Sequence, residues 1–161
     1  MPEKILIVYE SIHQGNTQKL AEKIGKALKA KAVSADKPGE LAPIGDYALV
    51  GFGSGIYAGR HGKGLFKFVE NLPKLKGKRA FIFSTSTWGE SSIEKHHGAL
   101  RKKLEEKGFR IVGEFACKGF NHWGPFKLIG GMNKGHPDEK DLAAAGEFAE
   151  GLATKLSKKR L

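Results

Sequence analysis

Cysteine is nearly absent from this chain of 161 residues, which contains only Cys117. One cysteine excludes a disulfide within the chain and any zinc or iron–sulfur site built from several cysteines. Cys117 ends the apolar run FRIVGEFAC, a position that favours a buried small side chain over a reactive thiol.

Long apolar runs are absent as well. No stretch approaches the ~20 residues that a helix needs to cross a bilayer. Glu3 and Lys4 lead directly into a short strand-like run, which is not the layout of a signal peptide. We therefore expect a soluble cytoplasmic protein without membrane insertion, folded as a single domain over residues 1–161.

Acidic residues are scarce relative to basic ones. The chain has 17 Asp and Glu against 28 Lys and Arg, a net charge of +11. Such a balance raises the expectation of an anionic partner, although much of the excess falls on helix faces and in the tail KLSKKRL, as on an ordinary solvated surface. No zinc-finger spacing or RNA-binding signature occurs, so a nucleic-acid partner is disfavoured.

Strand-like and helix-like segments alternate along the chain. This alternation predicts parallel strands joined by right-handed crossovers, with helices on both faces of one doubly wound α/β sheet. The expected strands span residues 4–9, 31–35, 46–52, 79–84 and 110–117, and the expected helices span residues 17–30, 64–71, 92–107 and 138–156.

Four loops follow the first, third, fourth and fifth of these strands, at residues 10–17, 53–64, 84–91 and 118–137. Ligands of doubly wound sheets bind beyond the carboxyl ends of the strands, where these loops meet. All four are rich in Gly, Ser, Thr and aromatic residues. The last is long for a compact domain, and we interpret it as an ordered flap over the site or a partner contact.

The first loop, ESIHQGNT, opens the first helix. Its hydroxyl, imidazole and amide side chains surround Gly15, and unpaired main-chain amides at a helix start bind phosphate without any lysine. An ordinary turn capped by Asn16 or Thr17 explains the same residues, so both interpretations stay open from this loop alone. The loop lacks GxxxxGK[ST] and GxGxxG, which excludes the usual nucleotide motifs.

The second and third loops each contribute an aromatic residue. Tyr57 follows the small residues of SGIY, and Trp88 follows a run of hydroxyl residues. Two aromatics at one sheet edge suggest a planar ring held between them. The alternative is that each ring packs on the loop beneath it.

These motifs together resemble the flavodoxin family. SIHQGNTQKLAEKI is similar to the flavodoxin phosphate-binding loop, and SGIY and STSTWG are similar to the loops that flank a flavin ring in that family. The resemblance implies a flavodoxin-like three-layer α/β/α sandwich, with a five-stranded parallel sheet in the order 2-1-3-4-5. It also implies non-covalently bound FMN.

The resemblance assigns cofactor-binding residues by position, and it implies no catalytic side chain and no metal ligand set. Residues 117–120 are expected to adjoin the site from below. The phosphate is expected at Ser11, His13, Gln14, Gly15, Asn16 and Thr17, one side of the ring at Ser54, Gly55, Ile56 and Tyr57, and the ribityl chain and other ring edge at Thr85, Ser86, Thr87, Trp88 and Gly89.

The function that follows is an electron carrier shuttling between redox partner proteins, which the positive charge of this chain predicts to be acidic. The alternative is an NAD(P)H-dependent flavin or quinone reductase, in which Arg60, His61 and Lys63 receive nucleotide phosphates or a carboxylated substrate. An ordinary solvated basic loop explains the same three residues, and both interpretations stay open. Flavodoxins are typically acidic, so the charge of this chain departs from the family. Whether the protein is a monomer or a homodimer is left open.

Three further kinds of site are disfavoured by the sequence. No Ser–His–Asp set is evident, and Glu10 stands alone where a receiver domain needs clustered carboxylates. The adjacent pair His96 and His97 makes a poor chelate, because neighbouring helical residues point about 100° apart.

Overall fold

The computed structural model describes residues 4–11, 15–86, 89, 93–119 and 137–158. A parallel sheet forms its centre, in the strand order β2-β1-β3-β5-β6. This order confirms the predicted 2-1-3-4-5 arrangement of the main strands. They are β1 (Ile5–Glu10), β2 (Lys31–Ser34), β3 (Leu49–Tyr57), β5 (Lys78–Ser86) and β6 (Phe109–Lys118), and a short strand, β4 (Arg60–His61), pairs antiparallel with β3.

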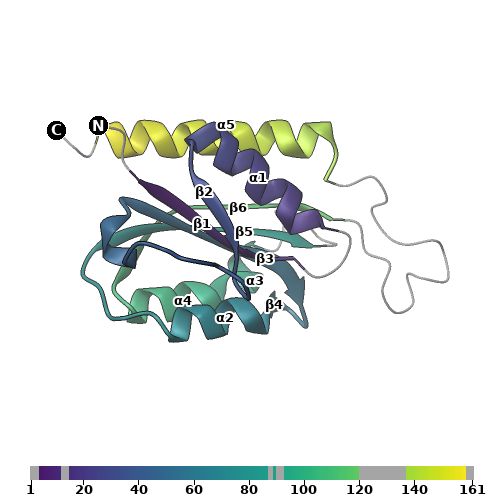
Figure 1. Cartoon of the computed structure of the whole chain (residues 1–161). Helices are drawn as coiled ribbons and strands as arrows, with labels where there is room; N and C mark the ends of the chain where they lie inside the picture. The colour runs from purple at the N-terminus through teal and green to yellow at the C-terminus, as the bar shows by residue number, and fades with distance from the viewer. Residues whose placement is uncertain (1–3, 12–14, 87–88, 90–92, 120–136, 159–161) are drawn as a thin grey trace.

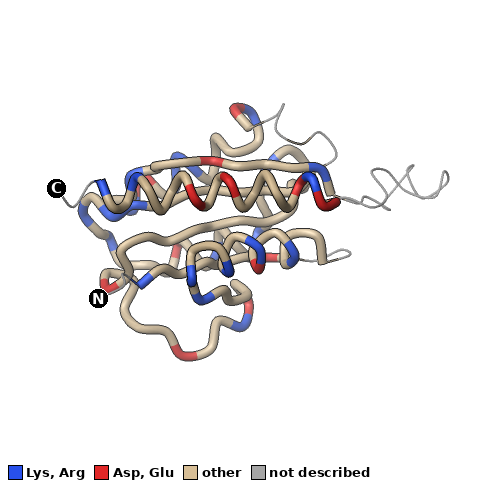
Figure 2. Tube along the Cα trace, turned by 90° about the horizontal axis from the view of Figure 1, so that it is seen from above, with Lys and Arg blue, Asp and Glu red and all other residues tan. Residues whose placement is uncertain are grey.

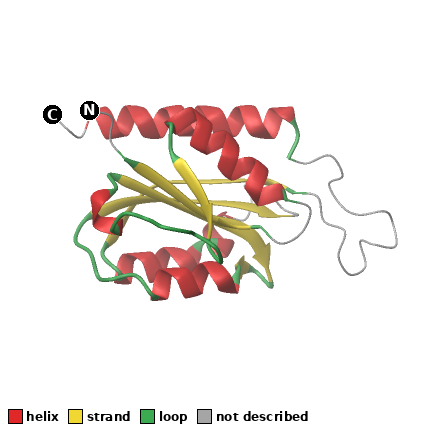
Figure 3. Ribbon diagram, in the orientation of Figure 1, coloured by secondary structure: helices red, strands yellow, loops and turns green. Residues whose placement is uncertain are grey.

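Helices cover both faces of the sheet, which confirms the three-layer prediction (Figure 1). Figure 3 shows the strands as a single central layer between two helical ones. One face carries α1 (Asn16–Leu28) and α5 (Glu139–Lys158), and the other carries α2 (Lys63–Glu70), α3 (Ile93–His96) and α4 (Gly98–Glu106). A 3₁₀ turn, η1 (Ile44–Asp46), leads into β3.

The core is divided by the sheet into two apolar clusters, because successive side chains of a strand point to opposite faces. Phe52 and Ile82 pack under α2 and α4, whereas Phe81 and Phe83 pack under α1 and α5. A β-carbon on Gly51 or Gly53 would lie 2.2 Å from the Phe81 or Phe83 ring. These two glycines of β3 therefore make room for the aromatic rings of the neighbouring strand.

The structure corrects the prediction that residues 53–64 form a loop. β3 continues to Tyr57 and turns back into β4, with Ile56 opposite His61. The turn places Ala58 at φ 52° and Gly59 at φ 81°. Tight hairpin turns with positive φ are usually signalled by Asn-Gly or Asp-Gly, and here alanine occupies the first position, so the signal is weak.

The expected single helix over residues 92–107 is interrupted at His97, between α3 and α4. Gly98 is a weak helix former, and the buried His97 side chain is hydrogen-bonded to two strands. Gly108, at φ 93°, ends the helical segment as the sequence predicts.

Basic residues are spread over the surface. Figure 2 shows Lys and Arg on several helices and loops, with acidic residues interleaved along α5. This distribution supports the interpretation of part of the excess charge as solvated surface. Within the described part of the chain, no helix combines the length and apolarity that crossing a bilayer requires.

Candidate functional site

Gly15 is the N-cap of α1, and its left-handed backbone has φ 65° and ψ 20°. Gly15 caps the helix without any side-chain hydrogen bond, and no acidic residue lies in the first turn. The expectation that Asn16 or Thr17 is the N-cap is therefore wrong, because Gly15 occupies that position. Ser11 Oγ accepts a hydrogen bond from the Gln18 amide at 3.3 Å. The positive end of the helix dipole faces the carboxyl edge of the sheet without a charged cap.

Three of the predicted loops meet beside this helix start. Thr17 Oγ1 lies 2.9 Å from Thr85 Oγ1, and both side chains are buried. A β-carbon on Gly119 would lie 3.0 Å from Asn16 Nδ2 and 3.1 Å from Thr85 Cβ. The start of α1, the end of β5 and the residue after β6 thus lie close together at one point.

The β3–β4 hairpin carries the second group of predicted residues. Ser54 is buried; its hydroxyl donates to the Gly55 carbonyl at 2.6 Å and accepts from the Gly62 amide at 2.9 Å. Ile56 and Tyr57 are half-buried at the end of β3. A β-carbon on Gly55 would lie 2.7 Å from the Tyr57 hydroxyl, so the Tyr57 ring lies against bare backbone. The Ser54 hydroxyl stabilises the hairpin from within.

The end of β5 is held by short local contacts. The Gly89 amide donates to Ser86 Oγ at 3.0 Å, and the Gly119 amide donates to the Ser86 carbonyl at the same distance. Ser86 therefore connects two of the converging loops. Of the predicted site residues, His13, Gln14, Thr87 and Trp88 lie outside the described residues, as does the flap over residues 120–136.

Glu10, at the end of β1, caps α2 across the sheet. Its carboxylate accepts hydrogen bonds from the Gly64 amide at 3.3 Å and the Leu65 amide at 3.2 Å. A β-carbon on Gly62 would lie 1.9 Å from Glu10 Oε1, so glycine is needed there. The carboxylate supplies the cap that the helix lacks locally and connects β1 to the hairpin segment.

Sequence inspection missed a hydrogen-bonded set of two buried residues, Ser84 and His97, and two half-buried ones, Glu114 and Arg101. Ser84 Oγ lies 2.7 Å from His97 Nε2, and His97 Nδ1 lies 2.9 Å from Glu114 Oε1. Arg101 makes two hydrogen bonds of 2.9 Å to the Glu114 carboxylate. Burial of Glu114 opposes ionisation, but the bonds from His97 and Arg101 outweigh it and lower its pKa to about 2. No local motif connects these residues, because they lie on β5, between α3 and α4, and on β6.

His61 is also buried, which contradicts both its role as a phosphate-binding group in the reductase alternative and its place in a solvated basic loop. Its Nε2 lies 3.0 Å from the Phe83 carbonyl oxygen. Burial, with a smaller contribution from nearby His97, lowers the pKa of His61 to about 3. Of the three residues proposed to receive phosphates, only Arg60 and Lys63 are exposed.

Cys117 is a free, buried thiol, as the sequence predicts. Burial, together with the charges of Asp141 and Asp138, raises its pKa to about 12. Within the described ranges, no group of three or more His, Cys, Asp or Glu side chains is arranged to hold a metal ion.

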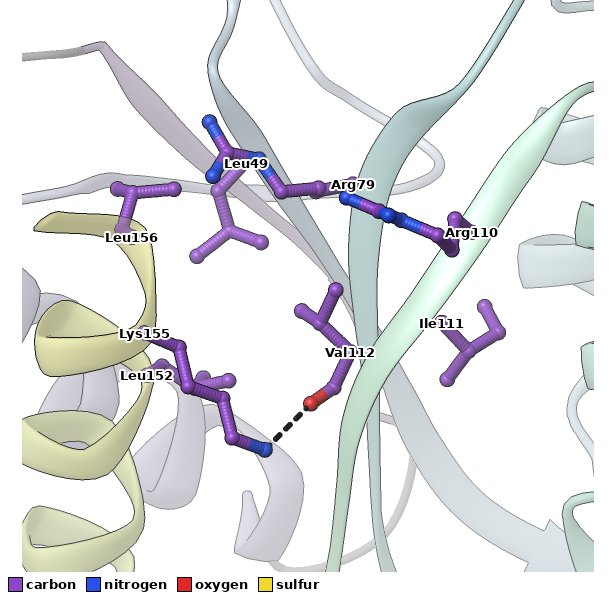
Figure 4. Close-up of a pocket in the computed structure, with 8 residues that line it drawn as sticks. All are labelled: Leu49, Arg79, Arg110, Ile111, Val112, Leu152, Lys155 and Leu156. Carbon is purple, nitrogen blue, oxygen red and sulfur yellow. Dashed lines mark hydrogen bonds between the residues drawn. The ribbon is translucent and has the colours of Figure 1, made fainter. Parts of the chain in front are cut away.

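A cavity of about 340 Å³ lies at the opposite, amino-terminal end of the strands. Figure 4 shows Leu49, Arg79 and Arg110 at the starts of their strands, facing the last turns of α5. Lys155 Nζ donates to the Val112 carbonyl at 2.9 Å across it. Because ligands of such sheets bind at the carboxyl ends of the strands, this cavity is distinct from the candidate site.

The sheet order and the converging loops define a flavodoxin-like α/β fold. The family of flavodoxin domains matches residues 6–119. A solved archaeal flavodoxin superposes with a TM-score of 0.68 at 20% identity, over 96% of this chain and 99% of that one. Flavodoxin 1 of Bacillus cereus superposes with a TM-score of 0.64 at 16% identity, over 94% and 98%.

A curated relative from Methanocaldococcus jannaschii, described as an uncharacterized protein, is 48% identical over 152 residues, which is 92% of this chain and 97% of the relative. The chain belongs to the flavodoxin family. Membership of this family implies a flavin cofactor, typically FMN.

Proposed function

We propose that the chain, as a single domain, binds FMN at the carboxyl edge of its sheet and carries electrons between redox partner proteins. The observation that supports this most directly is the contact between Thr17 and Thr85, 68 residues apart in sequence. It brings the helix start that suits a phosphate next to the strand end that suits a ribityl chain. FMN, when bound, supplies the reversible electron chemistry.

The residues at the α1 N-terminus fit a phosphomonoester. The start of α1 has Gly15 as its N-cap and no acidic residue in its first turn, so the positive end of its dipole favours an anion. Among the described residues, nothing lies within 4 Å of the position of a β-carbon on Gly15. Ser11 and Thr17 supply hydroxyl groups at the same place. These neutral donors hold an anionic phosphate by hydrogen bonds and need no lysine.

The surface beside the hairpin fits an acidic protein partner. Arg60 is exposed, and its guanidinium lies 4.5 Å from the centre of the Phe66 ring. Lys63 is exposed at the start of α2. Positive groups at the rim of a redox site attract an acidic partner and accelerate its association, in a way that falls with ionic strength.

Fluorescence titration of the purified protein with FMN and riboflavin tests the cofactor. We expect FMN to bind at least ~10 times more tightly than riboflavin, because only FMN adds charge-assisted hydrogen bonds at the helix start. Equal affinities, or no binding of either flavin at ~100 µM, would contradict the proposal.

Rapid mixing of the FMN-loaded protein with NADPH separates the carrier from a reductase. The carrier reacts slowly with NADPH and rapidly with a reduced partner protein. Fast bleaching of the flavin by NADPH would instead support the reductase. In that case Arg60 and Lys63, and not the buried His61, would be the groups available to the nucleotide phosphates.

A further inference from the structure

Two buried histidines lie together beneath the hairpin, on the face of the sheet covered by α2 and α4. His61 is 2% exposed and His97 is fully buried, and their ring centroids are 4.9 Å apart. They come from different elements, since His61 ends β4 and His97 separates α3 from α4. Buried imidazoles are uncommon unless hydrogen bonds fix them, so their contacts indicate what the pair does.

His97 is held from both sides. A carboxylate only accepts hydrogen bonds, so Nδ1 of His97 carries a proton and donates to Glu114, which Arg101 fixes in turn. The other nitrogen, Nε2, contacts Ser84 at the end of β5. Ser84 is 1% exposed, so a substrate does not reach its hydroxyl, which excludes it as a hydrolytic nucleophile. This arrangement positions the His97 ring instead of activating Ser84.

His61 connects the hairpin to the central strand β5. The Phe83 carbonyl can only accept, so Nε2 of His61 carries the proton and donates to it over 3.0 Å. The Nδ1 atom of His61 is buried with no hydrogen-bond partner among the described residues. With its pKa lowered to about 3, His61 is neutral at physiological pH, and the unpaired nitrogen carries no charge.

The hairpin that His61 fixes also carries Tyr57, which the resemblance places against the flavin ring. Tyr57 pairs with Arg60, and Ile56 pairs with His61, around a turn with Ala58 and Gly59 at positive φ. Because a two-residue strand makes few ladder bonds, the contact from His61 to Phe83 is a substantial part of what holds β4 to the sheet.

We propose that His61, Ser84, His97 and Glu114 form a polar clamp that holds the β3–β4 hairpin against β5 and so presets the ring-binding half of the flavin site. His61 and His97 act in it as positioning residues, through the backbone of the hairpin and of β5. The inference rests on the proposed function. It predicts that the clamp controls the affinity for the flavin ring and leaves the phosphate site at the α1 N-terminus unaffected.

The test compares His61→Leu with His61→Gln by titration with FMN and riboflavin. His61→Leu removes the donor to Phe83, and we expect both flavins to bind roughly 10-fold more weakly, with their affinity ratio unchanged. Gln retains a donor at the position of Nε2, so His61→Gln is expected to restore both affinities to within ~3-fold of the wild type. The matched control is His96→Gln, a neighbouring buried histidine outside the clamp, for which we expect wild-type affinities.

A second measurement requires no variant. In the ¹⁵N spectrum of wild-type imidazoles, His61 is expected as the neutral Nε2–H form at pH 7, with a signal that shifts when riboflavin binds. A His61 signal insensitive to riboflavin, or His61→Leu binding both flavins like the wild type, would overturn the clamp alone. Wild-type protein that binds neither flavin would overturn the proposed function and the clamp together.

Discussion

The hydroxyl of Thr17, in the first turn of α1, lies 2.9 Å from the hydroxyl of Thr85, at the end of β5. Both side chains are buried, so the hydrogen bond is shielded from bulk water. It connects the two halves of the candidate site. Mutation of either threonine therefore tests this contact specifically.

Replacing Thr17 with valine keeps the side-chain shape and removes this hydroxyl. We expect FMN affinity to fall roughly 5- to 10-fold, equivalent to ~1 kcal/mol, because Thr85 loses its partner and the helix start loses a donor. Thr154→Val in α5 is the matched control, since Thr154 is an exposed helical threonine bonded to the Glu150 carbonyl. If both variants bind FMN equally, the Thr17 hydroxyl has no role in the site.

Gly119 tests the close approach of the third loop. In Gly119→Ala the new methyl group would crowd Asn16 and Thr85 at 3.0 and 3.1 Å, so we expect a loss of stability of ~1 kcal/mol and weaker FMN binding. Gly151→Ala is the control, because its β-carbon meets nothing in the exposed face of α5. That change is expected to raise stability by roughly 0.5–1 kcal/mol, as measured by urea unfolding. Equal stability of the two variants would show that the loops do not meet as described.

Glu10 and Gly62 are expected to behave as a coupled pair. Glu10→Ala removes the cap of α2 and is expected to cost ~1 kcal/mol of unfolding free energy. Gly62→Ala places a methyl group where the Glu10 carboxylate lies, which displaces the same cap. In the double variant the steric conflict is gone, so its cost should be smaller than the sum of the two single costs. Additive costs in a denaturant cycle would contradict the cap.

Acid should destabilise the protein through the clamp. The pKa of His61 is lowered to about 3 by burial and by His97, with His96 adding in the same direction and Glu114 opposing it. Below about pH 6.5 an unfolded histidine binds a proton that folded His61 does not, so stability is present above that pH and falls as the pH drops toward 3. The pKa of Glu114, lowered to about 2, extends the loss below about pH 4.3, where an unfolded glutamate binds a proton.

Two variants, His61→Gln and Glu114→Gln, separate these contributions. His61→Gln is expected to reduce the slope of unfolding free energy between pH 6.5 and 4.3 by up to ~1.4 kcal/mol per pH unit, compared with the wild type. Glu114→Gln is expected to reduce the slope only below pH ~4.3. Urea unfolding between about pH 3 and 7, with several points on each side of pH ~4.3, measures both slopes, and an unchanged slope in His61→Gln would refute the buried, neutral state of His61.

Much of the fold could be predicted from the sequence. The strands around Ile7, Phe52 and Phe81 are short apolar runs buried on both faces, and their alternation with amphipathic helices leaves few topologies. The phosphate site stays a prediction, drawn from consecutive residues at the start of α1. These features are local, and local patterns can be read without tertiary contacts.

What could not be predicted depends on contacts between distant residues. Ser84, His97 and Glu114 become one hydrogen-bonded set only when β5, the α3–α4 break and β6 are packed together. His61, which looks like part of a basic surface loop, is buried because a turn at Ala58 and Gly59 folds it back under β3. Whether a side chain after a tight turn is buried depends on the pairing register of the two strands, here β3 and β4, and the sequence signals that register only weakly.

The central claim is that the amides at the start of α1 bind the phosphate of FMN. A titration of ¹⁵N-labelled protein, followed by amide resonances, tests it most directly by comparing FMN with riboflavin. The account predicts that the Asn16, Thr17 and Gln18 amides shift strongly with FMN and only slightly with riboflavin, while Gly55 and Tyr57 shift with both. Equal shifts at α1 with the two flavins, or none with FMN, would contradict it.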